Sequence, residues 1–186
     1  MTKALFFDID GTLVSFETHA IPASTIEALT IAHEKGIKIF IATGRPKAII
    51  NNLADIQDRG LIDGYITMNG AYCFVGDEVI YKSAIPAGEV RALAQVCEQK
   101  GYPCIFVGEH TISVCQPNKL VHDIFYDFLH VDEIPVKTFE EAVQEEIFQM
   151  TPFVTVEEET EIQPQIPNCE SGRWFPAFAD ITAKGN

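Results

Sequence analysis

The chain has 186 residues, and its 13 Lys and Arg against 27 Asp and Glu give a formal net charge of −14. An apolar share of 47% and a charged share of 22% are typical of a globular protein and exclude a disordered or fibrous chain. Nucleic acids and anionic membrane surfaces are bound mainly through clusters of Lys and Arg, so the acidity argues against both as partners. Length alone suggests one domain, or a modest domain with an insertion.

Targeting signals are not evident. The acidic Asp8 follows only four apolar residues, which is too soon for a secretory signal, and no apolar stretch approaches the roughly 20 residues of a spanning helix. Five cysteines are an odd number and form no C-x-x-C pair. Cys104 and Cys115 would face each other across a hairpin, but reduced thiols are favoured without a signal peptide. We therefore expect a cytoplasmic protein.

The first third alternates strand and helix patterns. Apolar runs predict short buried strands over residues 3–8 and 37–42, and a third strand over residues 65–68. Between the first two, Ser24 and Glu27 are spaced as a capping box after Pro22, and Lys35-Gly36 is a helix-stop signal. Between the second and third, Pro46 predicts the start of a helix with one apolar face (Ile49, Ile50, Leu53 and Ile56). Such alternation predicts a parallel sheet with covered faces.

The pattern then changes to hairpins and helices. Residues 72–75 and 78–82 flank Gly76-Asp77, and residues 104–107 and 111–115 flank Gly108-Glu109, so both pairs read as hairpins. Helices are predicted after Pro86 and Pro117. Strand-like runs at 147–154 and 173–182 bracket an acidic helical stretch at 157–161. This part of the chain reads as an α+β unit distinct from the first sheet.

Two carboxylates follow the first predicted strand. Asp8 and Asp10 are separated by one residue and would point the same way if the chain stays extended, at the edge where open α/β sheets bind ligands. Close like charges favour a bound cation, and oxygen ligands favour Mg²⁺ over zinc. Gly11 allows a sharp turn there. A calcium loop does not fit, because Leu13 stands where that loop needs glycine, but an acidic turn without chemistry stays open.

The second candidate segment is Thr43-Gly44-Arg45, between a buried strand and a predicted helix. A hydroxyl, a glycine and free N–H groups at a helix N-terminus would cradle a phosphate. Thr43 would bind a phosphoryl oxygen, and Arg45 would reach the substrate or a cap over the site. An ordinary turn explains the segment equally well. One strand–helix unit separates it from Asp8, so the two strand ends should be neighbours.

These motifs resemble those of the haloacid dehalogenase (HAD) superfamily of phosphatases. Asp8-Ile9-Asp10-Gly11-Thr12 matches the first motif and Thr43-Gly44-Arg45 the second. The segment around Asn69-Gly70-Ala71 is typical of the Cof-type, class IIB sugar-phosphatase branch. The resemblance implies an α/β fold with a Rossmann-like parallel-sheet core and an inserted α+β (C2-type) cap. It divides the chain into core residues 1–82, cap residues 83–172, and a return to the core at 173–186.

The resemblance also implies roles. Asp8 would attack phosphorus to form an aspartyl-phosphate, and Asp10 would serve as general acid and then general base. Mg²⁺ would be held by Asp8 and Asp10, the latter through its backbone carbonyl. The substrate-binding set would be Thr12, Thr43, Gly44, Arg45 and Asn69. The implied function is hydrolysis of small phosphorylated metabolites, with sugar phosphates as the expected substrates, and the oligomeric state is undefined.

The chain departs from the family after the cap. The third-motif lysine and the fourth-motif acidic loop, which follow the cap in the family, are not found, and Lys184 lies too early to be the catalytic lysine. The sequence therefore looks like an incomplete core. The alternative function is a catalytically incompetent fragment or a module that binds phosphate or a partner. Trp174 could stack on a sugar, but a core role is favoured.

Overall fold

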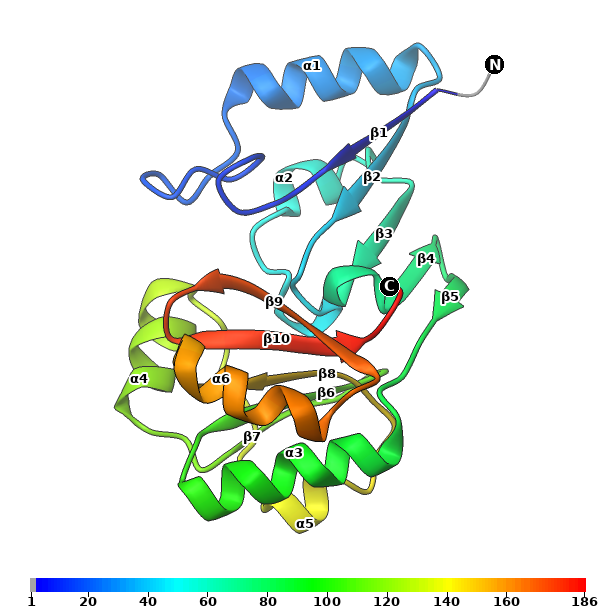
Figure 1. Cartoon of the computed structure of the whole chain (residues 1–186). Helices are drawn as coiled ribbons and strands as arrows, with labels where there is room; N and C mark the ends of the chain where they lie inside the picture. Colours follow the sequence, from blue (N-terminus) through cyan, green and yellow to red (C-terminus); the bar gives the residue numbers. More distant parts are fainter. Residues whose placement is uncertain (1–2) are drawn as a thin grey trace. The chain divides into compact units, whose positions relative to one another are not determined.

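The computed structural model describes residues 3–186 and divides the chain into two compact units. The first ends at Lys82 and the second runs from Ser83 to Asn186 (Figure 1). Each unit has its own five-stranded sheet, and each is described below by itself. None of the described helices is long and apolar enough to cross a membrane.

The first unit is built on a mixed sheet in the order β1-β2-β3-β4-β5. Strands β1 (Ala4–Phe7), β2 (Lys38–Ala42) and β3 (Gly64–Thr67) are parallel, while β4 (Tyr72–Val75) and β5 (Glu78–Lys82) continue it as an antiparallel hairpin. A short 3₁₀ turn, η2 (Met68–Gly70), joins β3 to β4. The parallel order confirms the predicted sheet, and the pairing of Phe7 with Ile41 makes the carboxyl ends of β1 and β2 neighbours.

Helix α1 (Ala23–Glu34) connects β1 to β2 and buries Leu29 in the core of this unit. It ends at the predicted place: the N–H groups of Gly36 and Ile37 donate to the carbonyls of His33 and Ala32, with Gly36 at a φ of 75°. This is a Schellman arrangement. The predicted capping box is wrong, because the helix already begins at Ala23 and Ser24 therefore lies inside its first turn, where no side chain caps it.

The helix predicted after Pro46 is also wrong. A single 3₁₀ turn, η1 (Lys47–Ile49), is followed by extended backbone at Ile50 and then by a one-turn helix, α2 (Ala54–Gln57). Leu53 and Ile56 are nonetheless fully buried. The apolar spacing therefore indicated which residues are buried. An irregular segment packed on the sheet buries these residues without forming a continuous helix.

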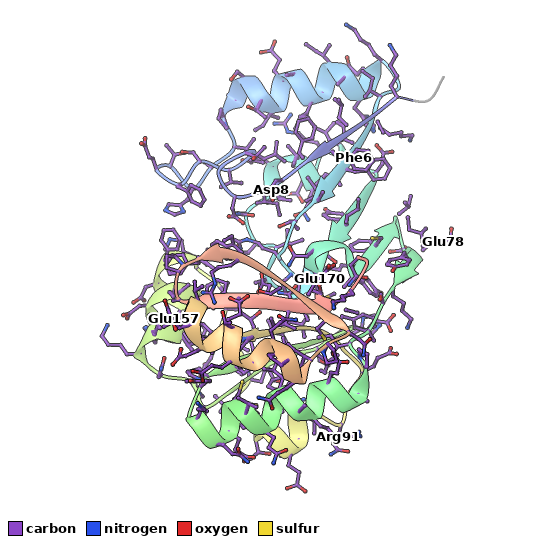
Figure 2. All side chains as sticks on the ribbon, viewed as in Figure 1. Phe6, Asp8, Glu78, Arg91, Glu157 and Glu170 are labelled. Carbon is purple, nitrogen blue, oxygen red and sulfur yellow. The ribbon has the colours of Figure 1, made fainter. Side chains whose placement is uncertain are left out.

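Strand β1 exists as predicted, but it is not buried. Leu5 is 40% and Phe6 57% exposed, because β1 is the edge of the described sheet and pairs only with β2. The Phe6 ring stacks on Phe40 of the neighbouring strand with centroids 5.0 Å apart. Figure 2 labels Phe6 on this edge strand.

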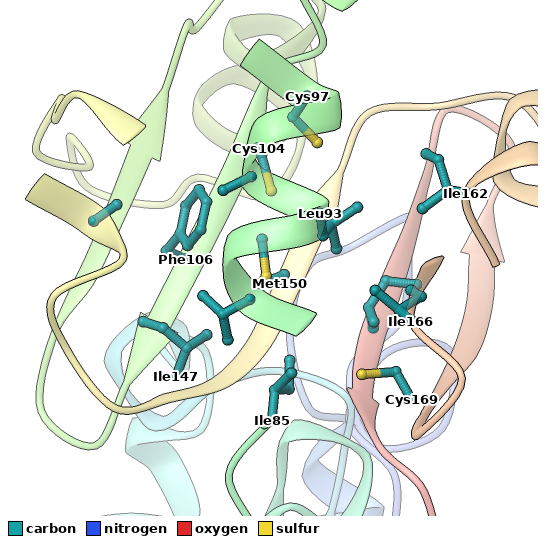
Figure 3. Packing of buried hydrophobic residues seen from close by; sticks show 14 of the residues in the cluster. Ile85, Leu93, Cys97, Cys104, Phe106, Ile147, Met150, Ile162, Ile166 and Cys169 are labelled. Carbon is teal, nitrogen blue, oxygen red and sulfur yellow. The ribbon is translucent and has the colours of Figure 1, made fainter. Parts of the chain in front are cut away.

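The second unit is an antiparallel sheet in the order β7-β6-β8-β10-β9. The strands are β6 (Cys104–Gly108), β7 (Ile112–Cys115), β8 (Ile147–Pro152), β9 (Cys169–Phe175) and β10 (Phe178–Ala183). Helices α3 (Ala87–Lys100), α5 (Phe139–Ala142) and α6 (Val156–Ile162) contribute to one core with residues of this sheet, including Leu93, Phe106 and Met150 (Figure 3). The short helix α4 (Lys119–Val121) runs into a π-helical stretch, η3 (His122–Phe128), and η4 (Gln163–Gln165) follows α6.

Residues 173–186 do not return to the first sheet, which corrects the expected boundary at residue 172. Pro176 and Ala177 fold the predicted single strand into the β9–β10 hairpin, in which Phe178 pairs with Phe175. Strand β10 then inserts between β9 and β8, where Ile181 pairs with Met150. Every residue of β10 is buried, and Ala179 and Ile181 lie in the core of this unit, which favours the second sheet as the one that the strand joins. Trp174 of β9 is 46% exposed, so its predicted core role is wrong.

All five cysteines are free thiols. Cys104 and Cys115 are register partners across the β6–β7 hairpin, as the sequence predicts. Burial raises the pKa of Cys115 and of Cys169 to about 12, and that of Cys104 well above its ordinary value. Thiols held in the protonated form are poor nucleophiles, so these three cysteines are packing residues.

Candidate active site

Asp8 follows β1 directly, at the carboxyl end of the strand (Figure 2), and Asp10 lies two residues further along the chain. Burial raises the pKa of Asp8, and the neighbouring charge of Asp10 raises it further, while the Ile9 N–H and the Arg45 guanidinium act in the opposite direction. The ionised form of Asp8 is therefore disfavoured at this place. A bound cation would stabilise it, because an opposite charge favours the ionised form.

The turn after Asp10 is tightly defined. Gly11 donates to Val14 O (2.9 Å), and the N–H groups of Leu13 and Val14 both donate to Ile9 O (3.0 and 2.9 Å). Gly11 has a φ of 74°, and a Cβ at this position would lie 2.7 Å from the Phe16 ring. Only glycine satisfies both the conformation and the space. Thr12 follows in this turn with an exposed side chain.

Arg45 is paired with Asp10 rather than left free for a ligand. Its Nε donates to Asp10 Oδ2 (2.7 Å) and its Nη2 to Asp10 Oδ1 (2.9 Å), a bidentate arrangement. Nη1 donates to Ile49 O (3.0 Å), and Arg45 is only 7% exposed. No local sequence pattern indicates this pairing; the one signal is that both residues follow neighbouring parallel strands. The ion pair fixes the orientation of the Asp10 carboxylate.

The remaining predicted residues meet around Gly44. Thr43 is buried, and its Oγ1 accepts from Arg45 N (3.1 Å). Asn69 donates its N–H to Thr43 O (3.3 Å), and a Cβ on Gly44 would lie 3.0 Å from Asn69 Oδ1. Asn69 has a φ of 53°, a left-handed conformation that asparagine tolerates better than most residues. Segments 25 residues apart thus converge at one place, and Gly44 allows the close approach.

The predicted phosphate cradle at a helix N-terminus is not formed. Only the 3₁₀ turn η1 follows Pro46, and the Arg45 N–H is already bonded to Thr43. An anion at this place would have to be bound by side chains and by single backbone groups, without the dipole of a long helix.

The oxygen ligands suit a hard cation, although the donor set is small. Both carboxylate oxygens of Asp10 accept from Arg45, which leaves the Asp8 carboxylate and the Asp10 backbone carbonyl as the donors predicted for Mg²⁺. Among the described residues, the one group of three close metal-binding side chains is His122, Asp123 and Asp127, all exposed and in the other unit. Asp8 and Asp10 therefore fit Mg²⁺ in chemistry, without a third acidic side chain beside them.

Comparison with known proteins identifies the fold. A solved structure of the HAD subclass IIB sugar phosphatase BT4131 superposes with a TM-score of 0.96 and 76% identity, over 99% of this chain and 71% of that one. BT1666 of Bacteroides thetaiotaomicron, a HAD-superfamily phosphatase, gives 0.83 and 33% identity over 100% of this chain and 68% of that one. YkrA of Bacillus subtilis (strain 168), provisionally assigned as a phosphatase, is 28% identical over 99% of this chain and 69% of its own length.

The family model for haloacid dehalogenase-like hydrolases matches residues 5–186, which includes both units. The α/β fold class and the family predicted from the motifs are thereby confirmed, as is the expectation of an enzyme of the phosphatase type. The chain belongs to the haloacid dehalogenase-like hydrolase family.

Proposed function

We propose that this chain is a Mg²⁺-dependent phosphatase that hydrolyses small phosphorylated metabolites, with sugar phosphates as the substrate class. The observation that carries the proposal is the Asp8 carboxylate, placed at the end of β1 beside an Asp10 that Arg45 holds in one orientation. The similarity to a sugar phosphatase supports the substrate class. The five free thiols support the cytoplasm as its location.

Asp8 is the nucleophile in this proposal. One of its carboxylate oxygens forms a bond to phosphorus as the bond between phosphorus and the ester oxygen breaks, which gives an aspartyl-phosphate. The leaving oxygen takes a proton from Asp10, which enters this step as the carboxylic acid and leaves it as the carboxylate. Water then attacks phosphorus, Asp10 takes a proton from that water, and inorganic phosphate leaves Asp8 free. Arg45 keeps the Asp10 carboxylate aimed, which is a positioning role.

The other predicted residues bind the phosphoryl group. Thr43 and Gly44 lie beside Asn69, and Thr12 lies in the turn that carries Asp10. Asp8 and the Asp10 carbonyl would hold Mg²⁺. When bound, the ion supplies positive charge that offsets the repulsion between the Asp8 carboxylate and the substrate phosphate.

A second function is favoured by one observation: Asp10 gives both carboxylate oxygens to Arg45, and no third acidic side chain clusters with it and Asp8 among the described residues. A site of this kind would bind phosphate without turning over. Phosphate binding by the native chain, with no hydrolysis above a blank, would select this alternative.

The test is hydrolysis of an aryl phosphate by the native chain, with and without Mg²⁺. The Asp8→Asn variant should lose at least about a thousand-fold in turnover, because removal of a nucleophile abolishes the covalent route. The matched control is Asp55→Asn, which removes an exposed carboxylate from α2 in the same unit. Equal activity of Asp8→Asn and Asp55→Asn would overturn the assignment of Asp8.

A further inference from the structure

Two consecutive residues other than glycine adopt a left-handed backbone conformation at the end of β3. Met68 has a φ of 52° and Asn69 a φ of 53°, and Gly70 follows with a φ of 98°. Among the described residues, Met68 is the one non-glycine residue with a positive φ that is also buried. Such residues carry a conformational cost and persist only where the surrounding structure enforces them, most often at functional sites, so the segment needs an explanation.

The reversal of the chain between β3 and β4 does not by itself require this conformation. Residues 68–71 connect the two strands, whose ends pair as Thr67 and Tyr72 (Figure 1). The next hairpin of the same sheet, between β4 and β5, takes its left-handed conformation at Gly76, with a φ of 56°. A hairpin loop can thus place positive φ angles on glycine, where they cost little. We therefore look for the reason in the contacts of residues 68 and 69.

The left-handed segment packs on the loop that follows β2. The Met68 N–H donates to Arg45 O at 3.3 Å. The Asn69 N–H donates to Thr43 O, also at 3.3 Å. The Asn69 side chain lies against Gly44, because a Cβ there would be 3.0 Å from Asn69 Oδ1 and 3.4 Å from its Nδ2. Thr43 and Arg45 are buried, whereas Asn69 is exposed, so its amide lies at the predicted phosphate-binding segment and is open to a ligand.

Burial and hydrogen bonds hold Met68 in its conformation. Its side chain is 2% exposed, and its carbonyl accepts from Ala71 N (3.0 Å). The preceding residue, Thr67, is fully buried, and its Oγ1 donates to Tyr72 O (2.8 Å). Met68 offers no side-chain group that would bind a phosphate, because a thioether sulfur is only a weak acceptor. What Met68 contributes to the site is the direction in which the chain enters Asn69.

We propose that Met68 is a positioning residue of the phosphate-binding site, which directs Asn69 onto Gly44 through its left-handed backbone. The exposed amide of Asn69 donates a hydrogen bond to a phosphoryl oxygen, and Met68 itself does not touch the substrate. A residue at position 68 that leaves the left-handed region would turn this amide away from Thr43 and Gly44. The proposal rests on the proposed function, because it explains how one member of the phosphate-binding set is oriented.

Leucine and isoleucine at position 68 separate backbone conformation from packing. The two side chains are isomers, but only isoleucine is branched at Cβ, which disfavours the left-handed region. The dissociation constant of inorganic phosphate is measured on the full chain by isothermal titration calorimetry. Met68→Leu should keep it within about two-fold of the native value, whereas Met68→Ile should raise it about ten-fold. Equal dissociation constants in the two variants would overturn the proposal, because Met68 would then be a packing residue alone.

A double-mutant cycle shows whether Met68 acts through Asn69. Asn69→Ala removes the amide and should weaken phosphate binding about ten-fold. In that background Met68→Ile should change the dissociation constant by less than about two-fold, because the group that Met68 orients is gone. The same weakening by Met68→Ile in both backgrounds would show a general structural effect and would overturn the proposal.

A comparison at Asn69 tests the left-handed segment whether or not Met68→Ile folds. Glycine adopts a positive φ freely, whereas alanine does not. Asn69→Gly should therefore unfold at a higher urea concentration than Asn69→Ala, although both variants lose the amide and should bind phosphate with the same weakened affinity. A lower urea midpoint for Asn69→Gly than for Asn69→Ala would contradict the left-handed conformation on which the proposal depends.

Failure of this inference is distinguishable from failure of the proposed function, because phosphate binding does not require turnover. Hydrolysis of an aryl phosphate by the native chain, with equal phosphate affinity in Met68→Leu and Met68→Ile, would remove only the positioning role. Phosphate binding that depends on the residue at position 68, without any hydrolysis, would instead remove the phosphatase and leave the positioning role. A native chain that does not bind phosphate would overturn the inference.

Discussion

The strands of the two sheets are buried to different extents. Strands β6, β8 and β10 of the second unit are buried along their whole length, whereas β1 and β5 of the first unit are exposed at nearly every position. Their chemistry differs in the same way. In the first unit the proposed site residues follow the strand ends, and in the second unit buried polar side chains lie on neighbouring strands. Ligands of open α/β sheets bind at the carboxyl ends of the strands, so the first unit is where we expect the chemistry.

The largest expected effect compares one residue type in both sheets. Phe106 is 1% exposed in the second core and makes an edge contact with Phe139, so Phe106→Ala should cost about 3–5 kcal/mol of unfolding free energy. Phe6 is 57% exposed and stacks on Phe40, so Phe6→Ala should cost at most about 1.5 kcal/mol. Urea unfolding followed by Trp174 fluorescence and by far-UV circular dichroism measures both. Similar losses would show that the sheets do not differ in burial.

The second prediction concerns the buried ion pair of the first unit. Arg45→Met leaves Asp10 without its partner and should destabilise that unit by about 3 kcal/mol, because an uncompensated charge remains in a mostly buried place. Turnover should fall as well, since the Asp10 carboxylate is no longer held. Lys38→Met is the matched control: its Nζ lies 2.6 Å from Asp63 Oδ1, but the side chain is 51% exposed, so about 1 kcal/mol or less is expected. Equal losses in the two variants would contradict a structural role for the Asp10–Arg45 pair.

The third prediction is a pH dependence in the second unit. Burial pushes the pKa of Glu89 upward, but hydrogen bonds from Cys169 Sγ and from Asn168 outweigh it and hold the pKa below its ordinary value of 4.5. A lowered folded-state pKa contributes stability that is present above the unfolded value and is lost as the pH falls through the folded value. Glu89→Gln should therefore cost about 1–2 kcal/mol at pH 7 and progressively less below about pH 4.5.

The control for this pH dependence is Glu98→Gln, an exposed carboxylate on the same helix α3. It should shift the unfolding free energy by no more than about 0.5 kcal/mol at any pH. A constant difference between the native chain and Glu89→Gln from pH 7 to pH 3 would show that the Glu89 carboxylate has the same pKa in both states.

The smallest expected effect compares helix starts. Thr155 and Glu158 form a complete capping box at the start of α6, so Thr155→Ala should cost about 1 kcal/mol. Ser24 lies at the start of α1 without a capping bond, and Ser24→Ala should change stability by less than about 0.5 kcal/mol. Chemical unfolding of the two variants decides the point. A larger cost at Ser24 would show that this residue caps α1 after all.

The sequence was informative wherever neighbouring residues decide the structure. Turn signals at Gly76-Asp77 and Gly108-Glu109 predicted both hairpins, because a tight turn brings adjacent strands together with little choice of partner. The end of α1 at Lys35-Gly36 was predicted for the same reason, because adjacent residues determine where a helix stops. The prediction of a helix after Pro46 was wrong because apolar spacing indicates burial and not the backbone conformation. An irregular segment packed on a sheet buries the same residues.

By itself, the sequence indicated the parallel pairing of β1, β2 and β3, the family motifs, and the neighbouring strand ends after which Asp8 and Thr43 follow. Only the tertiary structure decided that Arg45 pairs with Asp10, that Trp174 is exposed, and that β10 joins the second sheet. The physical reason is the same in all three. Each of these features depends on contacts with residues that are distant in the sequence. The free energy of such contacts depends on burial and charge in the folded chain, which a local sequence pattern does not reveal.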